Sequence, residues 1–114
     1  MAVTKDELAA NLKSVTWGEL ERRVQAGIRA LHRDDPEWID MFDLDRFNLR
    51  CHYSCSFGQT YGSFNQGLEH FEWEHEDAEH RGLFVCELSA ADKDAQYAAL
   101  DFIWREQITA LQDA

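Results

Sequence analysis

The sequence predicts an all-α fold, a compact single domain over residues 1–114 with about five short-to-medium helices and at most a vestigial β-hairpin. Apolar residues recur at helical spacing in two long stretches of the chain. Several predicted helices begin at threonine, serine or aspartate, the residues that commonly cap helices. The length of 114 residues supports one hydrophobic core and leaves no room for a second domain.

Two sequences of the capping-box form open the first two predicted helices. Thr4-x-x-Glu7 precedes a short helix that should end near Lys13, and Thr16-x-x-Glu19 precedes a longer one. Gly27 lies on the apolar side of the longer helix, so we expect a close helix–helix approach there. The apolar stripe of that helix consists of Leu20, Val24, Ile28 and Leu31.

Pro36 separates the second predicted helix from a third. It suits the first position of a helix, with Asp35 as the cap, and this short helix should reach about Phe42. Residues 43–49 then alternate between polar and apolar, which is the pattern of a strand. Aspartate and asparagine disfavour strands, so a turn-rich connector is the alternative. Ser63 is expected to cap a further helix that runs to about Phe71.

The last part of the chain combines an apolar run with a final helix. Residues 82–86 form either a short strand or a buried connector, and Ser89 or Asp92 begins a helix with an apolar stripe. Across the whole chain, the residues predicted to be mostly buried are Leu20, Val24, Ile28, Leu31, Trp38, Leu100, Ile103, Trp104 and Ile108.

The charge of the chain is strongly acidic and unevenly distributed. The chain carries 22 acidic and 11 basic side chains, a net charge of −11, and most of the excess lies in residues 58–114. Such a surface repels nucleic-acid backbones and anionic lipid headgroups, so direct binding to nucleic acid or to a membrane is disfavoured. Basic partners and divalent cations would be attracted. In the alternative interpretation, the acidity only keeps a small protein in solution.

Cysteine usage and the N-terminal residues predict a cytoplasmic protein. Cys51, Cys55 and Cys86 are an odd set, unlike the dense and even set of a secreted disulfide framework. Residues 1–7 lack the basic flank and the apolar stretch of a signal peptide. No apolar run approaches the roughly 20 residues of a membrane span. We therefore expect reduced thiols that pack as small apolar groups.

The cysteines and histidines form the one pattern that suggests a metal. Cys51-x₃-Cys55 falls within the spacing of a zinc-ligand pair, and His70, His75 and His80 follow it. A five-residue step turns about 140° on a helix, so these imidazoles would point to different faces. We expect no metal and no cofactor, with a small metal-binding module as the weaker alternative.

The sequence contains no convincing constellation for catalysis. Residues 75–80 place two histidines one residue too far apart for the metalloprotease motif, and the glycine motifs of nucleotide-binding loops are absent. Cys55 lies beside a glycine-rich turn and could be interpreted as a catalytic nucleophile. A cysteine packed among Phe57, Tyr61 and Phe64 is the simpler interpretation. The protein is therefore predicted not to be an enzyme.

The block Cys-Ser-Phe-Gly-Gln-Thr-Tyr-Gly-Ser-Phe at residues 55–64 resembles a core block of uncharacterised small proteins of actinobacteria and their phages. Residues 43–47 and the pattern Leu100-x-x-x-Trp104-Arg105-x-x-Ile108 add to the resemblance. Thr60 departs from it, since leucine is expected there, and so does Arg81, which is inserted before a glycine. No activity is assigned to these proteins. The resemblance implies a viral origin, the host cytoplasm as location and a host protein as partner.

The segment that best fits an interaction site combines aromatic and acidic residues. Exposed aromatics with a charged rim are typical of binding hot spots. In the alternative, the two aromatic rings of this segment alternate inward along an extended chain. We predict a protein-binding site for a host protein, with a basic surface as the complementary chemistry, at Phe71, Glu72, Trp73, Glu74 and Glu76. The alternative function is an acidic mimic of nucleic acid that occupies a partner's basic groove.

Overall fold

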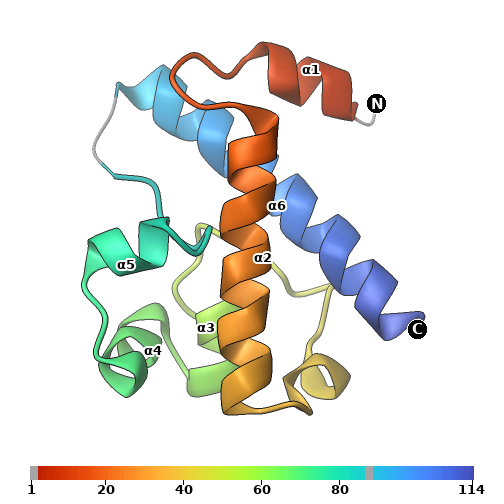
Figure 1. The fold of residues 1–114 in the computed structure, drawn as a ribbon, viewed down its shortest axis with the longest axis vertical. Helices are drawn as coiled ribbons and strands as arrows, with labels where there is room; N and C mark the ends of the chain where they lie inside the picture. The colour runs from red at the N-terminus through yellow and green to blue at the C-terminus, as the bar shows by residue number, and fades with distance from the viewer. Residues whose placement is uncertain (1–2, 87–88) are drawn as a thin grey trace.

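Two long helices, α2 and α6, form the frame of the fold, and the shorter helices pack around them (Figure 1). The computed structural model describes residues 3–86 and 89–114. Over these residues it contains helices and connectors but no strand, which confirms the all-α prediction. The elements are α1 (Lys5–Ala10), α2 (Trp17–Asp34), the 3₁₀ helix η1 (Trp38–Met41), α3 (Ser56–Tyr61), α4 (Phe64–Phe71), α5 (His75–Glu79) and α6 (Ala90–Gln112).

The short helices cover different parts of this frame. Helix α1 packs on α6 at one end of the molecule, and η1 contacts both α2 and α6 at the other end (Figure 1). Helices α3 and α4 pack against each other, and they lie with α5 on the opposite side of α2 from the C-terminal half of α6. The last turns of α2 therefore have neighbours on both sides.

The close approach predicted at Gly27 is present. A Cβ atom there would lie 2.3 Å from the backbone oxygen of Arg81 and 3.0 Å from the Trp104 ring. Because the first of these neighbours is backbone, it cannot move aside as a flexible side chain would. Only glycine lets α2 come this near both to α6 and to the connector that follows α5.

Four predicted helix starts are confirmed by their cap hydrogen bonds. The side chains of Thr4, Thr16, Ser63 and Ser89 each accept a hydrogen bond from the backbone N–H three residues later, over 3.1–3.3 Å. Helix α3 is capped in the same way by sulfur, since the Cys55 Sγ accepts from the Gly58 N–H at 3.3 Å. Each cap satisfies a donor that the helix itself leaves without a partner.

Several predicted boundaries are wrong. The first helix ends at Ala10, not near Lys13, because the N–H groups of Asn11 and Leu12 donate to carbonyls only three residues earlier, at Leu8 and Ala9, and so close its last turn. The segment after Pro36 forms only the short 3₁₀ helix η1, because its backbone N–H groups donate to carbonyls three residues earlier, although the Asp35 side chain accepts from the Glu37 N–H at 3.0 Å as a helix cap does. Residues 43–49 and 82–86 are connectors, so the strand alternative fails for both.

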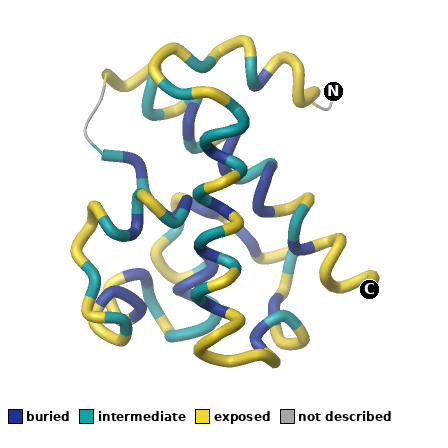
Figure 2. The backbone as a smooth tube through the Cα atoms, viewed as in Figure 1, coloured by how far each residue is buried: buried dark blue, intermediate teal, exposed yellow. Residues whose placement is uncertain are grey.

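The core agrees with the prediction and extends beyond it. Of the predicted core residues, all are buried except Ile28, which is half-buried. Figure 2 shows buried stretches both in the helices and in the connectors between them. The connectors supply further core residues, which helical periodicity could not reveal because the apolar residues of the connectors follow no repeat. These additional buried side chains include Phe42, Phe47, Leu49, Leu83 and Val85. Among the described residues, no helix is both long and apolar enough to cross a bilayer.

Candidate functional site

The five predicted site residues are brought together where α4 turns into α5. Phe71 ends α4, Glu72 and Trp73 form the turn, Glu74 is the N-cap of α5, and Glu76 lies in its first turn. The two aromatic side chains point toward α2, and the three glutamates are exposed. The segment therefore has an aromatic inner side and an acidic outer side.

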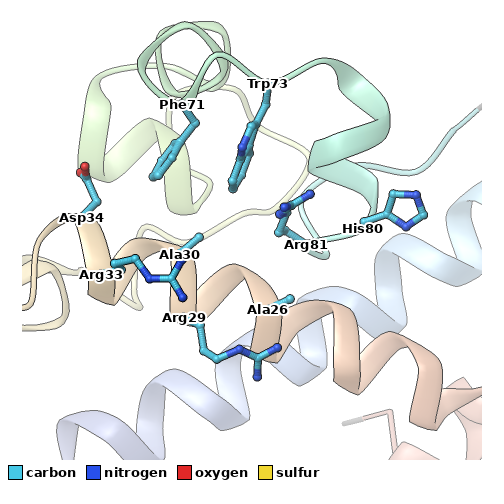
Figure 3. Close-up of a pocket in the computed structure, with 9 residues that line it drawn as sticks. All are labelled: Ala26, Arg29, Ala30, Arg33, Asp34, Phe71, Trp73, His80 and Arg81. Carbon is cyan, nitrogen blue, oxygen red and sulfur yellow. The ribbon is translucent and has the colours of Figure 1, made fainter.

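The Trp73 ring is packed on both of its faces. It stacks on Phe71 with 4.5 Å between ring centroids and an interplanar angle of 21°. The guanidinium of Arg81 lies 4.5 Å from its centroid, in cation–π contact. Figure 3 shows Trp73 between these two neighbours. Both aromatic side chains are half-buried and pack against the core, so the Trp73 indole presents only part of its edge to a partner.

Glu72 has a backbone conformation unlike any other non-glycine residue that the structure describes. Its φ of 58° and ψ of 41° lie in the left-handed region. This conformation closes α4, because the Glu72 N–H donates to the Glu69 carbonyl at 3.1 Å and the Trp73 N–H donates to the Leu68 carbonyl at 2.9 Å. Glycine is the residue normally found at this position of such a helix end.

The carboxylates of Glu72, Glu74 and Glu76 are not neutralised within the described part of the chain. No Lys, Arg or His nitrogen there lies within 4.0 Å of them. Glu74 and Asp77 form a capping box at the start of helix α5, in which the Asp77 Oδ2 accepts from the Glu74 N–H at 2.9 Å. The side chains of Glu72 and Glu76 are thus free of structural roles in helix capping and ion pairing, whereas Glu74 forms no ion pair but belongs to the capping box of α5.

A groove of about 700 Å³ separates this segment from α2 (Figure 3). We call it the arginine groove. Ala26 and Ala30 on α2 contribute small side chains, which leave space between the two walls. Around them the groove is lined by Arg29, Arg33, Asp34, Phe71, Trp73, His80 and Arg81. These arginines are not recognisable as a group from sequence patterning, although the i, i+4 spacing of Arg29 and Arg33 places them on one side of α2.

One acid, Asp34, also lines this groove, but it already has partners. Its Oδ1 lies 2.8 Å from the His70 Nε2, and its Oδ2 accepts from the Tyr61 hydroxyl at 2.7 Å. These hydrogen bonds, first from His70 and then from Tyr61, lower the pKa of the Asp34 carboxyl. Burial, followed by the hydrogen bond to Asp34, raises the pKa of Tyr61 well above its ordinary value. Asp34 is therefore an internal hydrogen-bond acceptor that fastens α2 to α3 and α4.

The histidines and cysteines do not converge. His70 stacks on Tyr61, His75 packs on Phe84, and His80 lines the arginine groove. Cys55 is the cap of α3, and Cys51 lies in the preceding turn, so the two thiols do not share a helix face. Within residues 3–86 and 89–114, no group of three or more His, Cys, Asp or Glu side chains is placed to hold a metal ion.

Comparison with protein-family models gave no match, and comparisons with curated proteins and with solved structures gave none either.

Proposed function

We propose that this chain is a small non-enzymatic protein that acts by binding another protein, and that Glu72, Glu74 and Glu76 form its contact surface, the acidic edge. The partner would present a basic surface, because no cation of the described chain neutralises these exposed carboxylates. The resemblance noted in the sequence would make this partner a host protein.

The observation that carries the proposal is the conformation of Glu72. A left-handed backbone costs about 1–2 kcal/mol for a residue with a Cβ atom, and glycine would make the same two hydrogen bonds without that cost. The Glu72 carboxylate also lies at the C-terminal end of α4, where the helix dipole favours a cation. A side chain that disfavours folding on both counts, and is exposed, is explained by a role outside the fold.

Phe71 and Trp73 support this edge from behind. Their stacking on each other and on Arg81 fixes the path of the turn, so the glutamates project from a rigid backbone. Binding then orders few main-chain torsions, which favours affinity. In this account the aromatic residues position the acidic edge, and the carboxylates make the contacts with the partner.

The test is a pull-down from lysate with the tagged full chain, washed at low and at high salt. One variant reverses the three glutamates of the acidic edge to lysine. A matched control makes the same change in net charge at three exposed glutamates elsewhere, which also have no cation within 4.0 Å among the described residues: Glu7, Glu37 and Glu106.

We expect a partner that is retained by the unmodified chain and by the control variant, lost by the edge variant, and released as salt screens the charges. Equal retention by both variants would remove the acidic edge from the interface. Equal loss from both would mean that only the net charge matters. Displacement of the partner by duplex DNA would identify the alternative function, an acidic mimic of nucleic acid.

A further inference from the structure

A second groove lies on the other side of the last turns of α2, away from the acidic edge. It has a volume of about 540 Å³ and is bordered by α2, η1 and the end of α6. We call it the apolar groove. Its apolar lining comes from all three elements and consists of Ile28, Trp38, Ile39 and Leu111. Leu111 is 42% exposed, so this wall is accessible from solvent.

The apolar groove is already formed in the free chain. The Gln112 side-chain amide donates to the carbonyl oxygens of Phe42 at 2.8 Å and of Ile39 at 3.3 Å. These bonds fasten the end of α6 to η1 and hold the two walls apart at a fixed distance. A ligand therefore need not create the site, which lowers the entropic cost of binding.

The charged residues that line the apolar groove are Arg29 and Arg33, with His32 beside them and no acidic side chain in the lining. This is unusual in a chain with a net charge of −11. Neither arginine has a carboxylate within 4.0 Å among the described residues. In contrast, the arginines with an acidic partner at that distance are Arg22, Arg23, Arg50, Arg81 and Arg105.

The nearest acids in the sequence are occupied elsewhere. Asp34 is held by His70 and Tyr61, and the Asp35 Oδ1 accepts from the Glu37 N–H at 3.0 Å. Arg29 and Arg33 also line the arginine groove, so they form a ridge between the two depressions. Two unpaired guanidinium groups beside an apolar groove complement a ligand that is both acidic and apolar.

We propose that the apolar groove docks an acidic segment of a partner protein, with one large apolar side chain inserted against Ile28, Ile39 and Leu111. Flanking aspartate or glutamate carboxylates of that segment pair with Arg29 and Arg33. A guanidinium can bind a carboxylate through two parallel hydrogen bonds, which gives the contact direction as well as energy. This surface is separate from the acidic edge and takes a ligand of the opposite charge.

The probe is a fluorescein-labelled synthetic peptide of about a dozen residues, made of glutamates with leucines at helical spacing, titrated with the full chain by fluorescence anisotropy. Two control peptides replace all leucines by serine or all glutamates by glutamine. One protein variant combines Arg29→Glu with Arg33→Glu, and another is Leu111→Ser. The matched controls are Lys13→Glu with Arg46→Glu, and Met41→Ser, at exposed residues that do not line the groove.

The parent peptide should bind, and both control peptides should bind at least about tenfold more weakly. The double arginine variant and Leu111→Ser should each raise the Kd by a similar factor, whereas the matched controls should not. Because the substituted residues are exposed, every variant should keep a folded far-UV CD spectrum and a cooperative thermal transition well above the assay temperature, which separates lost binding from lost folding.

Absence of binding by the parent peptide, or equal weakening by the matched controls, would overturn the proposal. Binding that needs the glutamates but not the leucines would move the contact to the arginine groove and also contradict it. Displacement of the peptide by decanoate, combined with an unchanged Kd in Leu111→Ser, would also contradict the proposal. Glu72→Gln should leave peptide binding intact, so this result is independent of the proposed acidic edge.

Discussion

The Trp104 Nε1 donates a buried hydrogen bond of 2.7 Å to the carbonyl oxygen of Gly82. This bond ties α6 to the connector that follows α5. Gly82 has a φ of 71°, and a Cβ atom there would lie 2.9 Å from the Val24 side chain on α2. Together with the approach of Gly27 to Trp104, the contact joins α2, α6 and the connector at one point. The position of the segment 71–81 relative to α2 therefore depends on this junction.

Replacing Trp104 should destabilise the fold strongly. Trp104→Ala removes a fully buried ring and should lower the free energy of unfolding by about 3–5 kcal/mol. Trp104→Phe retains most of the packing but leaves the Gly82 carbonyl without its donor, so its loss should be smaller, about 1–3 kcal/mol. Urea denaturation followed by CD measures both. An unchanged midpoint for Trp104→Ala would contradict the assigned core.

Glu72→Gly should stabilise the protein by about 1 kcal/mol, because glycine adopts the left-handed conformation without a Cβ clash. Glu72→Gln keeps that conformational cost and removes only the charge from the end of α4, so its gain should be a few tenths of a kcal/mol. Urea midpoints of the two variants and the unmodified chain make the comparison. A loss of stability in Glu72→Gly would mean that the Glu72 side chain supports the fold.

The Asp34 hydrogen bonds should make stability depend on acid pH. The pKa of Asp34 is lowered in the fold, so its stabilising effect is present above the unfolded pKa near 3.8 and is lost as the pH falls through the folded pKa. Asp34→Asn should therefore flatten the decline in stability below about pH 4. Urea midpoints between about pH 5 and pH 2.5 test this, and equal slopes for both proteins would contradict it.

The same contact has a consequence at alkaline pH. The pKa of Tyr61 is raised in the fold, chiefly by burial and then by Asp34, so its stabilising effect is present below the unfolded pKa near 10 and is lost above it. Tyr61→Phe should remove the part of the alkaline loss of stability that this phenol causes. A variant that loses stability above pH 10 as steeply as the unmodified chain would contradict this assignment.

The three thiols should differ in reactivity. The pKa of Cys51 is lowered, chiefly by a hydrogen bond from the Ser54 side chain, whereas burial raises the pKa of Cys55 and of Cys86. Because the thiolate is the nucleophile, iodoacetamide should modify Cys51 first. Mass spectrometry of a time course measures the order, with Cys51→Ser as the control. Faster modification of Cys55 would contradict the burial described for it.

Much of the fold could be predicted from local sequence. The caps at Thr16 and Ser63 and the apolar stripe of α2 are signals within a few residues, and they identify α2 and α4 correctly. The segment after Pro36 was predicted as an α-helix reaching Phe42, but it contains only the 3₁₀ helix η1, whose backbone bonds span three residues. The apolar spacing of so short a segment does not distinguish the two kinds of helix.

The candidate site was predictable only in part. The aromatic and acidic residues at 71–76 are neighbours in the chain, and the sequence alone marks them as distinctive. Which way Trp73 faces depends on Arg81, and the two grooves depend on α2 lying beside α4 and η1. These are tertiary contacts. The left-handed conformation of Glu72 is likewise unmarked, since glutamate is not a residue that predicts it.

The measurement that tests the central claim most directly is the affinity of the Glu72 variants for the partner retained in the pull-down, determined by calorimetry alongside their stability. The account predicts that Glu72→Gly is more stable than the unmodified chain and yet binds the partner at least about tenfold more weakly, with Glu72→Gln equally weakened. Unchanged affinity in a more stable Glu72→Gly would contradict it, because Glu72 would then have no role at the interface to set against its conformational cost.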